Sequence, residues 1–120
     1  MEMIDAIKRL SALAQDGRLD VFRLLVKVGP EGMAAGEIAR TLGIQANTLS
    51  AQLLVLSNAR LVHARRDGRS IIYSINFAAM SELLVYLMQD CCAGRAEVCA
   101  PLAVVVNRCR ASSKEKRRNA

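Results

Sequence analysis

The sequence contains very few aromatic residues. Of its 120 residues, 3% are aromatic and none is Trp, although 52% of the chain is hydrophobic. A core must therefore be built mainly from Leu, Val, Ile, Ala and Met side chains. At this length there is room for one compact domain and none for a second.

The sequence also lacks long apolar runs. No segment approaches the roughly 18 apolar residues that a membrane-spanning helix needs, and the amino terminus shows no signal-peptide pattern. We therefore expect a cytoplasmic protein without a membrane partner.

Cysteine is absent from the first 90 residues, and all four cysteines fall between residues 91 and 109. No Cys-x-x-Cys stands beside a βαβ pattern, no loop could cradle a phosphate, and His63 is the only histidine. A small thiol enzyme, such as a reductase, is therefore disfavoured. In a cytosolic chain, clustered cysteines are more typical of metal ligands or a redox sensor than of a disulfide framework.

The clearest structural pattern lies within residues 34–75. Two segments joined through Gly43 repeat apolar residues every three or four positions, which predicts two short helices with one apolar face each. The repeated residues are Ile38 and Leu42, then Leu49, Leu53 and Leu56. Two short helices connected in this way form a helix-turn-helix.

A β-hairpin is predicted directly after these helices. Residues 61–64 and 70–75 are rich in β-branched and aromatic side chains, and they flank an Asp67-Gly68 turn. The whole chain is thus predicted to be mainly α with a β-hairpin wing, a winged helix-turn-helix. The commonest use of that fold is DNA binding.

Three further helices are predicted over residues 2–15, 18–28 and 77–92. The first and the last have more apolar surface than one small domain can cover, so we expect them to pair with their copies in a homodimer. The alternative is that both pack on their own domain. Residues 1–107 would form the domain, and the polar, basic residues 108–120 a disordered tail.

The net charge of +6 lies mostly in that tail. Residues 108–120 carry a net +5, which leaves only +1 for residues 1–107. Within the domain, residues 60–69 combine four arginines with one acid, Asp67. This local charge lies on the wing, where contacts to DNA phosphates would be useful.

The second helix of a helix-turn-helix enters the major groove with its first turns nearest the bases. The polar residues there, which we take as candidate DNA-reading residues, are Gln45, Asn47, Thr48, Ser50 and Gln52. Their amides and hydroxyls can bond base edges or phosphates. Asn47 or Thr48 could instead cap the helix. Arg65, Arg66 and Arg69 are candidate phosphate ligands, or else belong to an ordinary solvated hairpin.

At this point residues 3–92 resemble the ArsR/SmtB family of bacterial metal- and metalloid-responsive repressors. The resemblance rests on four phrases in order, LDVFRLLV, GEIARTLGI, NTLSAQLLVLSNARLV and RRDGRSIIYSI. It implies a homodimer that blocks transcription when ligand-free and leaves double-stranded operator DNA when an inducer binds. Two positions depart from the family: Gln52, where histidine is frequent, and Arg60, where glycine is frequent. Because a left-handed backbone disfavours Arg, we expect the helix to end at Asn58.

The cysteines also distinguish subgroups of that family. The best-known arsenic sensors place paired cysteines in the first helix of the helix-turn-helix, and here that helix has none. Instead, DCCAGRAEVC at residues 90–99 resembles a subgroup whose arsenite site lies at the end of the dimerisation helix. The resemblance implies Cys91, Cys92 and Cys99 as ligands.

Three thiolates suit trivalent arsenic or antimony, whose lone pair occupies the fourth direction, and soft ligands select soft ions. We therefore expect arsenite, or else antimonite or a methylated arsenical, as inducer and no catalytic cofactor. Zinc or cadmium would need a fourth ligand, such as Cys109 or Asp90. A thiol redox sensor and inert, buried cysteines are the remaining alternatives.

Overall fold

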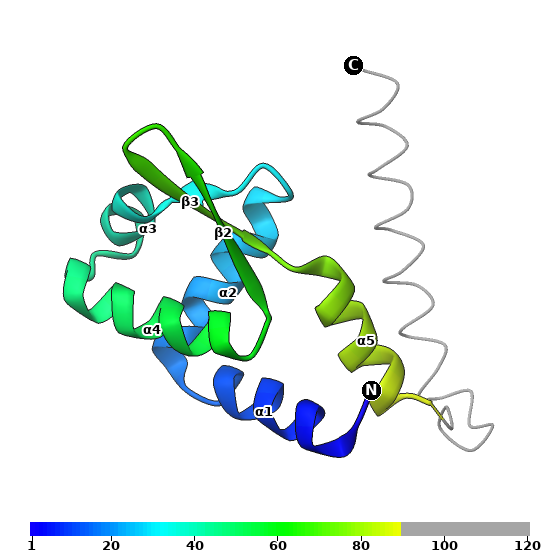
Figure 1. Ribbon diagram of the computed structural model, residues 1–120. Helices are drawn as coiled ribbons and strands as arrows, with labels where there is room; N and C mark the ends of the chain where they lie inside the picture. The colour runs from blue at the N-terminus through cyan, green and yellow to red at the C-terminus, as the bar shows by residue number, and fades with distance from the viewer. Residues whose placement is uncertain (90–120) are drawn as a thin grey trace. The chain divides into compact units, whose positions relative to one another are not determined.

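The computed structural model describes residues 1–89. The four cysteines and the basic tail lie outside this range, and so does every prediction about them. The elements run in the order α1 (Met3–Leu13), α2 (Asp16–Val28), β1 (Met33–Ala34), α3 (Ala35–Leu42), α4 (Ala46–Asn58), β2 (Val62–Asp67), β3 (Ser70–Ile75) and α5 (Phe77–Leu87). Figure 1 shows this arrangement, and it confirms a mainly helical winged helix-turn-helix.

The turn between α1 and α2 is held by side chains that bond the main chain. From the sequence, Asp16 after the first helix is a plausible N-cap for α2, but the N-cap is Gln15, whose side-chain oxygen accepts a bond from the Arg18 amide. The Arg18 guanidinium reaches back to the carbonyl oxygen of Ala12 at 2.6 Å. Arg18 thereby satisfies a carbonyl at the end of α1 that has no partner within the helix.

The tight connection between α3 and α4 depends on Gly43, as the sequence predicted. Gly43 has a φ of +66°, and the amides of Gly43 and Ile44 bond the carbonyls of Arg40 and Ala39. These two bonds form a Schellman motif, in which glycine is favoured because it alone adopts a left-handed backbone without strain. The helix-turn-helix therefore has a turn fixed by backbone bonds.

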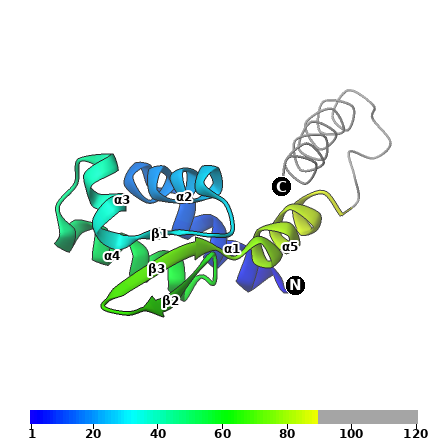
Figure 2. The ribbon, with the colours of Figure 1, turned by 90° about the horizontal axis from the view of Figure 1, so that it is seen from above.

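The sheet has three antiparallel strands in the order β1-β3-β2, side by side in Figure 2. The two-residue strand β1 was not predicted; it pairs Met33 with Tyr73. In the wing, Asp67 pairs with Ser70, so the turn residues are Gly68 and Arg69 and not Asp67 and Gly68. Gly68 has a φ of +62°, and a glycine at the first turn position is typical of a type II′ hairpin turn.

Helix α4 ends at Asn58, as expected, but Arg60 still adopts the left-handed conformation, with a φ of +63°. The amides of Arg60 and Leu61 bond the carbonyls of Ser57 and Leu56, in a second Schellman motif. The Asn76 side-chain amide donates to the Arg60 carbonyl at 2.9 Å, and the oxygen of the same side chain accepts a bond from the third amide of α5. Asn76 thus links the carboxyl end of α4 to the amino end of α5.

Helix α5 ends at Leu87, five residues earlier than the predicted end at Cys92. Arg9 ties α5 to α1, because its buried guanidinium donates to the Ala79 carbonyl at 2.8 Å and contacts Glu82 at 3.2 Å. The two helices proposed for dimerisation therefore have a fixed relationship within the unit Met1–Tyr86.

The core lies between α2, α3, α4 and the sheet. Its fully buried large side chains are Val21, Leu25, Ile38, Leu49, Leu53, Leu56, Leu61 and Ile75. The apolar stripe predicted on α1 faces away from this core, since Ile4 is 74% and Ile7 55% exposed. On α2 the apolar spacing predicts that Leu19 and Val26 face inward with Phe22 and Leu25, but Leu19 and Val26 are exposed.

Candidate DNA-binding surface

Helix α4 presents one continuous outward face. Asn47, Ala51 and Leu54 follow one another at four- and three-residue spacing, and all three are exposed. Residues at this spacing lie on the same side of a helix. The buried Leu49, Leu53 and Leu56 occupy the opposite side. Thr48 and Ser50 flank the outward face and are exposed as well.

The structure places Gln52 elsewhere than expected. Its side chain is only 9% exposed, and it lies against Gly17 in the first turn of α2. The reason is its position in the helical repeat, three residues after Leu49 and four before Leu56, which places it on the core side. Gln52 therefore does not belong to the outward face, and its side chain is not placed to contact DNA from that face.

The capping alternative for Asn47 and Thr48 is wrong. Helix α4 begins at Ala46, and its N-cap residue is Gln45, whose side chain makes no capping bond. Asn47 and Thr48 thus lie within the first turn, with exposed side chains. The first amides of α4 receive no bond from the N-cap side chain, and the amides at a helix start attract negatively charged groups.

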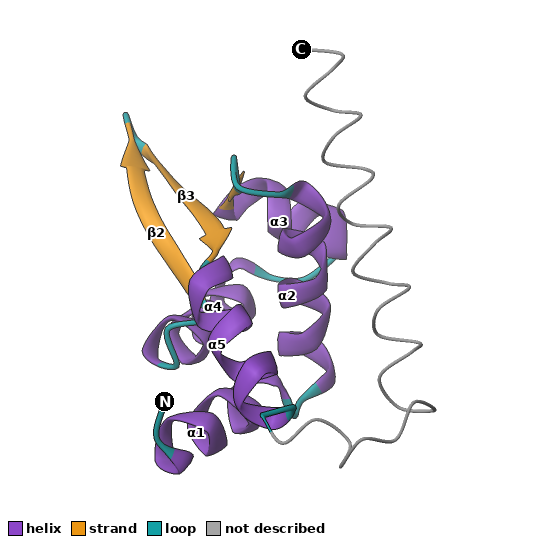
Figure 3. Ribbon diagram, turned by 90° about the vertical axis from the view of Figure 1, so that its right-hand side faces the viewer, coloured by secondary structure: helices purple, strands orange, loops and turns teal. Residues whose placement is uncertain are grey.

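The wing arginines do not form a single surface. Arg65 and Arg66 are neighbours in β2, so their side chains point to opposite faces of the hairpin. Arg65 donates to the Glu31 carbonyl at 2.8 Å and thereby anchors the wing to the loop before β1. Arg69 lies in the turn itself, at the tip that extends beyond the helices in Figure 3. Within residues 1–89, none of the three forms an ion pair.

Comparison with known proteins agrees with this geometry. Residues 13–65 match the family model of a helix-turn-helix domain. Over 73 residues the chain is 40% identical to Rv0081 of Mycobacterium tuberculosis, an uncharacterised helix-turn-helix transcriptional regulator. It is 32% identical to Mb0332 of Mycobacterium bovis, a possible ArsR-family regulator, whose homodimeric winged helix-turn-helix DNA-binding domain superposes with a TM-score of 0.59. That match covers 73% of this chain and 81% of the other.

The chain belongs to the ArsR/SmtB family. The family is a class of transcription regulators and not of enzymes. The expectation that the chain is not a small thiol enzyme is thereby confirmed. A third similar protein is the antimony-specific transcriptional repressor AntR, at 27% identity and a TM-score of 0.55, over 69% of this chain and 74% of that one. The match to Rv0081 covers 60% of this chain and 61% of Rv0081, so the chain spans less than two thirds of that relative.

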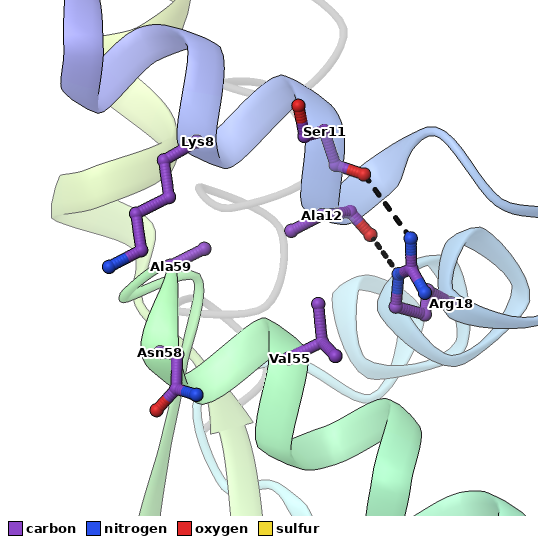
Figure 4. A pocket seen from close by; sticks show the side chains of 7 residues that line it. All are labelled: Lys8, Ser11, Ala12, Arg18, Val55, Asn58 and Ala59. Carbon is purple, nitrogen blue, oxygen red and sulfur yellow. Dashed lines mark hydrogen bonds between the residues drawn. The ribbon is translucent and has the colours of Figure 1, made fainter.

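A hollow of about 500 Å³ lies between α4 and α1 (Figure 4). Val55 and Asn58 line it from α4, and Lys8 and Ser11 from α1. Leu54, one residue before Val55, does not line it. Two neighbouring apolar residues of α4 thus have different surroundings, because one faces α1 and the other lies on the outward face.

The described residues do not contain a candidate metal site. Among residues 1–89, no group of three His, Cys, Asp or Glu side chains could hold a metal ion. The predicted ligands Cys91, Cys92 and Cys99 lie beyond that range.

No helix in the described range is long and apolar enough to cross a membrane.

Sequence reasoning missed Ala51 and Leu54 because it selected only polar residues on α4. Counting four and seven residues from Asn47 would have found both. The candidate DNA-binding surface therefore consists of the wing arginines and of five residues on α4: Asn47, Thr48, Ser50, Ala51 and Leu54.

Proposed function

We propose that this chain is a homodimeric transcriptional repressor that releases operator DNA when it binds trivalent arsenic. The outward face of α4 would enter the major groove, and the wing would contact phosphates. The observation that carries the DNA-binding part is the continuous exposed face of α4, next to wing arginines that form no ion pair within residues 1–89. Such a regulator would act in the cytoplasm on double-stranded DNA.

The homodimer is supported by apolar surface on the two terminal helices. Ile4 and Ile7 on α1, and Leu84 and Val85 on α5, are all exposed in the single chain. Large contiguous apolar patches on soluble proteins usually mark contacts with another protein. Mb0332, similar in sequence and fold, forms a homodimer. A two-fold dimer would place two copies of α4 in successive major grooves, roughly 34 Å apart.

The inducer is proposed from the residues that follow α5. Cys91, Cys92 and Cys99 supply three soft thiolates, the number that trivalent arsenic or antimony requires. The similarity to AntR, an antimony-specific repressor, supports a metalloid ligand. Zinc or cadmium with Cys109 or Asp90 as a fourth ligand is the alternative within the same fold, and a thiol redox switch is another.

The mechanism we propose uses the contacts of α5. A ligand that gathers the cysteines would pull on the segment that continues from α5, and α5 is bonded to α1 through Arg9 and to the end of α4 through Asn76. Movement of α5 would therefore change both the dimer contact and the placement of α4. Whatever factor the ligand imposes on DNA affinity, DNA must impose on ligand affinity.

The test is operator release. A DNA duplex selected by the reduced full-length protein is labelled, and fluorescence anisotropy follows the complex as arsenite is added. Wild type and Cys109→Ser should release the DNA, whereas Cys99→Ser should remain bound. Release by zinc, cadmium or an oxidant, without any response to arsenite, would refute the arsenic assignment and leave the DNA-binding assignment intact.

A further inference from the structure

We propose that Leu54 determines sequence specificity by contacting the methyl group of a thymine in the major groove. This inference rests on the proposed DNA-binding function and names a feature of the DNA that α4 would read. It concerns a residue that is neither polar nor charged, in a position where hydrogen-bonding side chains are usually sought.

The first observation is the exposure of Leu54. Its side chain is 61% exposed, more than any other leucine in residues 1–89. A single exposed leucine is common on protein surfaces and needs no explanation by itself. Leu54, however, lies seven residues after Asn47 and three after Ala51, on the outward face of α4. It therefore continues the strip of residues that would face the bases.

The second observation is that α4 carries no charged residue from Ala46 to Asn58. Arg and Lys are the usual partners of guanine, and Asp or Glu accepts a bond from cytosine, so α4 offers none of these contacts. The candidate surface of α4 offers one amide (Asn47), two hydroxyls (Thr48 and Ser50) and two aliphatic side chains (Ala51 and Leu54). The amide of Asn47 suits adenine, and the aliphatic groups suit the C5 methyl of thymine, the apolar group of the major groove. Both partners belong to A·T pairs.

The third observation is the small side chain between these two residues. Ala51 lies one turn after Asn47 and nearly one turn before Leu54, so no bulky group keeps the helix away from the base edges there. Leu54 also does not line the hollow that faces α1, whereas its neighbour Val55 does (Figure 4). No contact with α1 at that hollow competes for Leu54.

The experiment uses the full-length protein and DNA that it selects from a random duplex pool. Each thymine of one half-site is replaced, one at a time, by deoxyuridine, which lacks only the C5 methyl. At one position the dissociation constant of wild type should rise by about fourfold, as expected for the removal of one buried methyl group. With Leu54→Ala, this difference between thymine and uracil should disappear, while the protein remains folded because Leu54 is exposed.

Val55→Ala is the matched control, because it shortens the next aliphatic side chain of the same helix on a different side. It should keep the full effect of uracil. The inference is overturned if uracil has no effect at any position, or if its effect persists in Leu54→Ala. If the protein selects no DNA sequence at all, the proposed function fails together with the inference. Sequence-specific binding without a uracil effect refutes only the role of Leu54.

Discussion

The side-chain amide of Gln52 on α4 covers Gly17 in the first turn of α2 so closely that a methyl group on Gly17 would overlap the Nε2 atom. The contact is part of the packing between α4 and α2, beside the core residues that the two helices share. The Oε1 atom of Gln52 is buried and has no hydrogen-bond partner within the described residues. Since α4 carries the proposed DNA-reading face, the packing of this pair also sets the direction of that face.

Gly17 and Gln52 should therefore be energetically coupled. Gly17→Ala in the wild-type background should lower the free energy of unfolding, because the added methyl group displaces the Gln52 amide. In a Gln52→Ala background the same change should be neutral or stabilising, since alanine is the better helix former. Urea unfolding of the four proteins should give a coupling energy of about 1 kcal/mol or more. Additive effects would contradict the contact.

Arg60 occupies a position that glycine would fill better. Its φ of +63° is close to the +66° of Gly43, at the equivalent position after α3. Arg60→Gly should raise the free energy of unfolding by about 1 kcal/mol, and it keeps the main-chain carbonyl that Asn76 bonds. The matched change Gly43→Ala should lower it by about 1 kcal/mol, because only backbone strain is added where no atom lies near. Thermal unfolding measures both changes in stability. If the two substitutions changed the stability in the same direction, the explanation by backbone strain would be contradicted.

The exposed face of α1 should be the dimer contact. Ile7→Glu places a charge on that face without touching the core of the single chain, so the protein should become monomeric and stay folded. Leu19→Glu, on an exposed apolar position of α2, is the control and should leave the dimer intact. Sedimentation velocity measures the oligomeric state, and circular dichroism measures the fold. If Ile7→Glu remained a folded dimer, the exposed face of α1 would not be the dimer contact.

The three wing arginines should differ in their effect on the salt dependence of DNA binding. Removing one phosphate contact should reduce the slope of log affinity against log salt by about 0.9. Arg66→Ala and Arg69→Ala should each show this reduction. In a dimer the reduction should be twice as large, because both subunits lose the contact. Arg65→Ala should change the slope less, because its guanidinium is already held by the Glu31 carbonyl. Unchanged slopes in all three variants would mean that the wing does not bind phosphate.

Much of this fold follows from local sequence patterns. The apolar spacing of Ile38, Leu49, Leu53 and Leu56 predicted two helices, and their buried faces are confirmed. The turn at Gly43 and the hairpin after α4 were also predicted, because glycine and β-branched residues act over a few positions. The shift of the wing turn by one residue was missed, since a single Asp-Gly pair does not fix which residues pair across the hairpin.

The errors have two causes: residue type was given more weight than helical position, and some features depend on distant residues. Gln52 was assigned to the DNA-reading face because it is polar, although its spacing from Leu49 and Leu56 places it on the buried side of α4, against Gly17 of α2. The left-handed Arg60 depends in part on Asn76, sixteen positions along the chain, whose side-chain amide donates to the Arg60 carbonyl. Leu54 was overlooked because only polar residues of α4 were selected, although its spacing from Asn47 places it on the outward face. The roles of Cys91, Cys92 and Cys99 stay predictions, since they lie outside the described residues.

The central claim is that the outward face of α4 reads DNA. The most direct measurement is the affinity of the double variant Asn47→Ala, Ser50→Ala for the duplex that wild type selects, by fluorescence anisotropy at fixed salt. Each base contact removed should cost about 1–3 kcal/mol, so binding should weaken at least tenfold and lose its preference for the selected sequence. Thr41→Ala, an exposed change at the end of α3, is the control and should bind as wild type. Unchanged affinity and preference in the folded double variant would contradict the account.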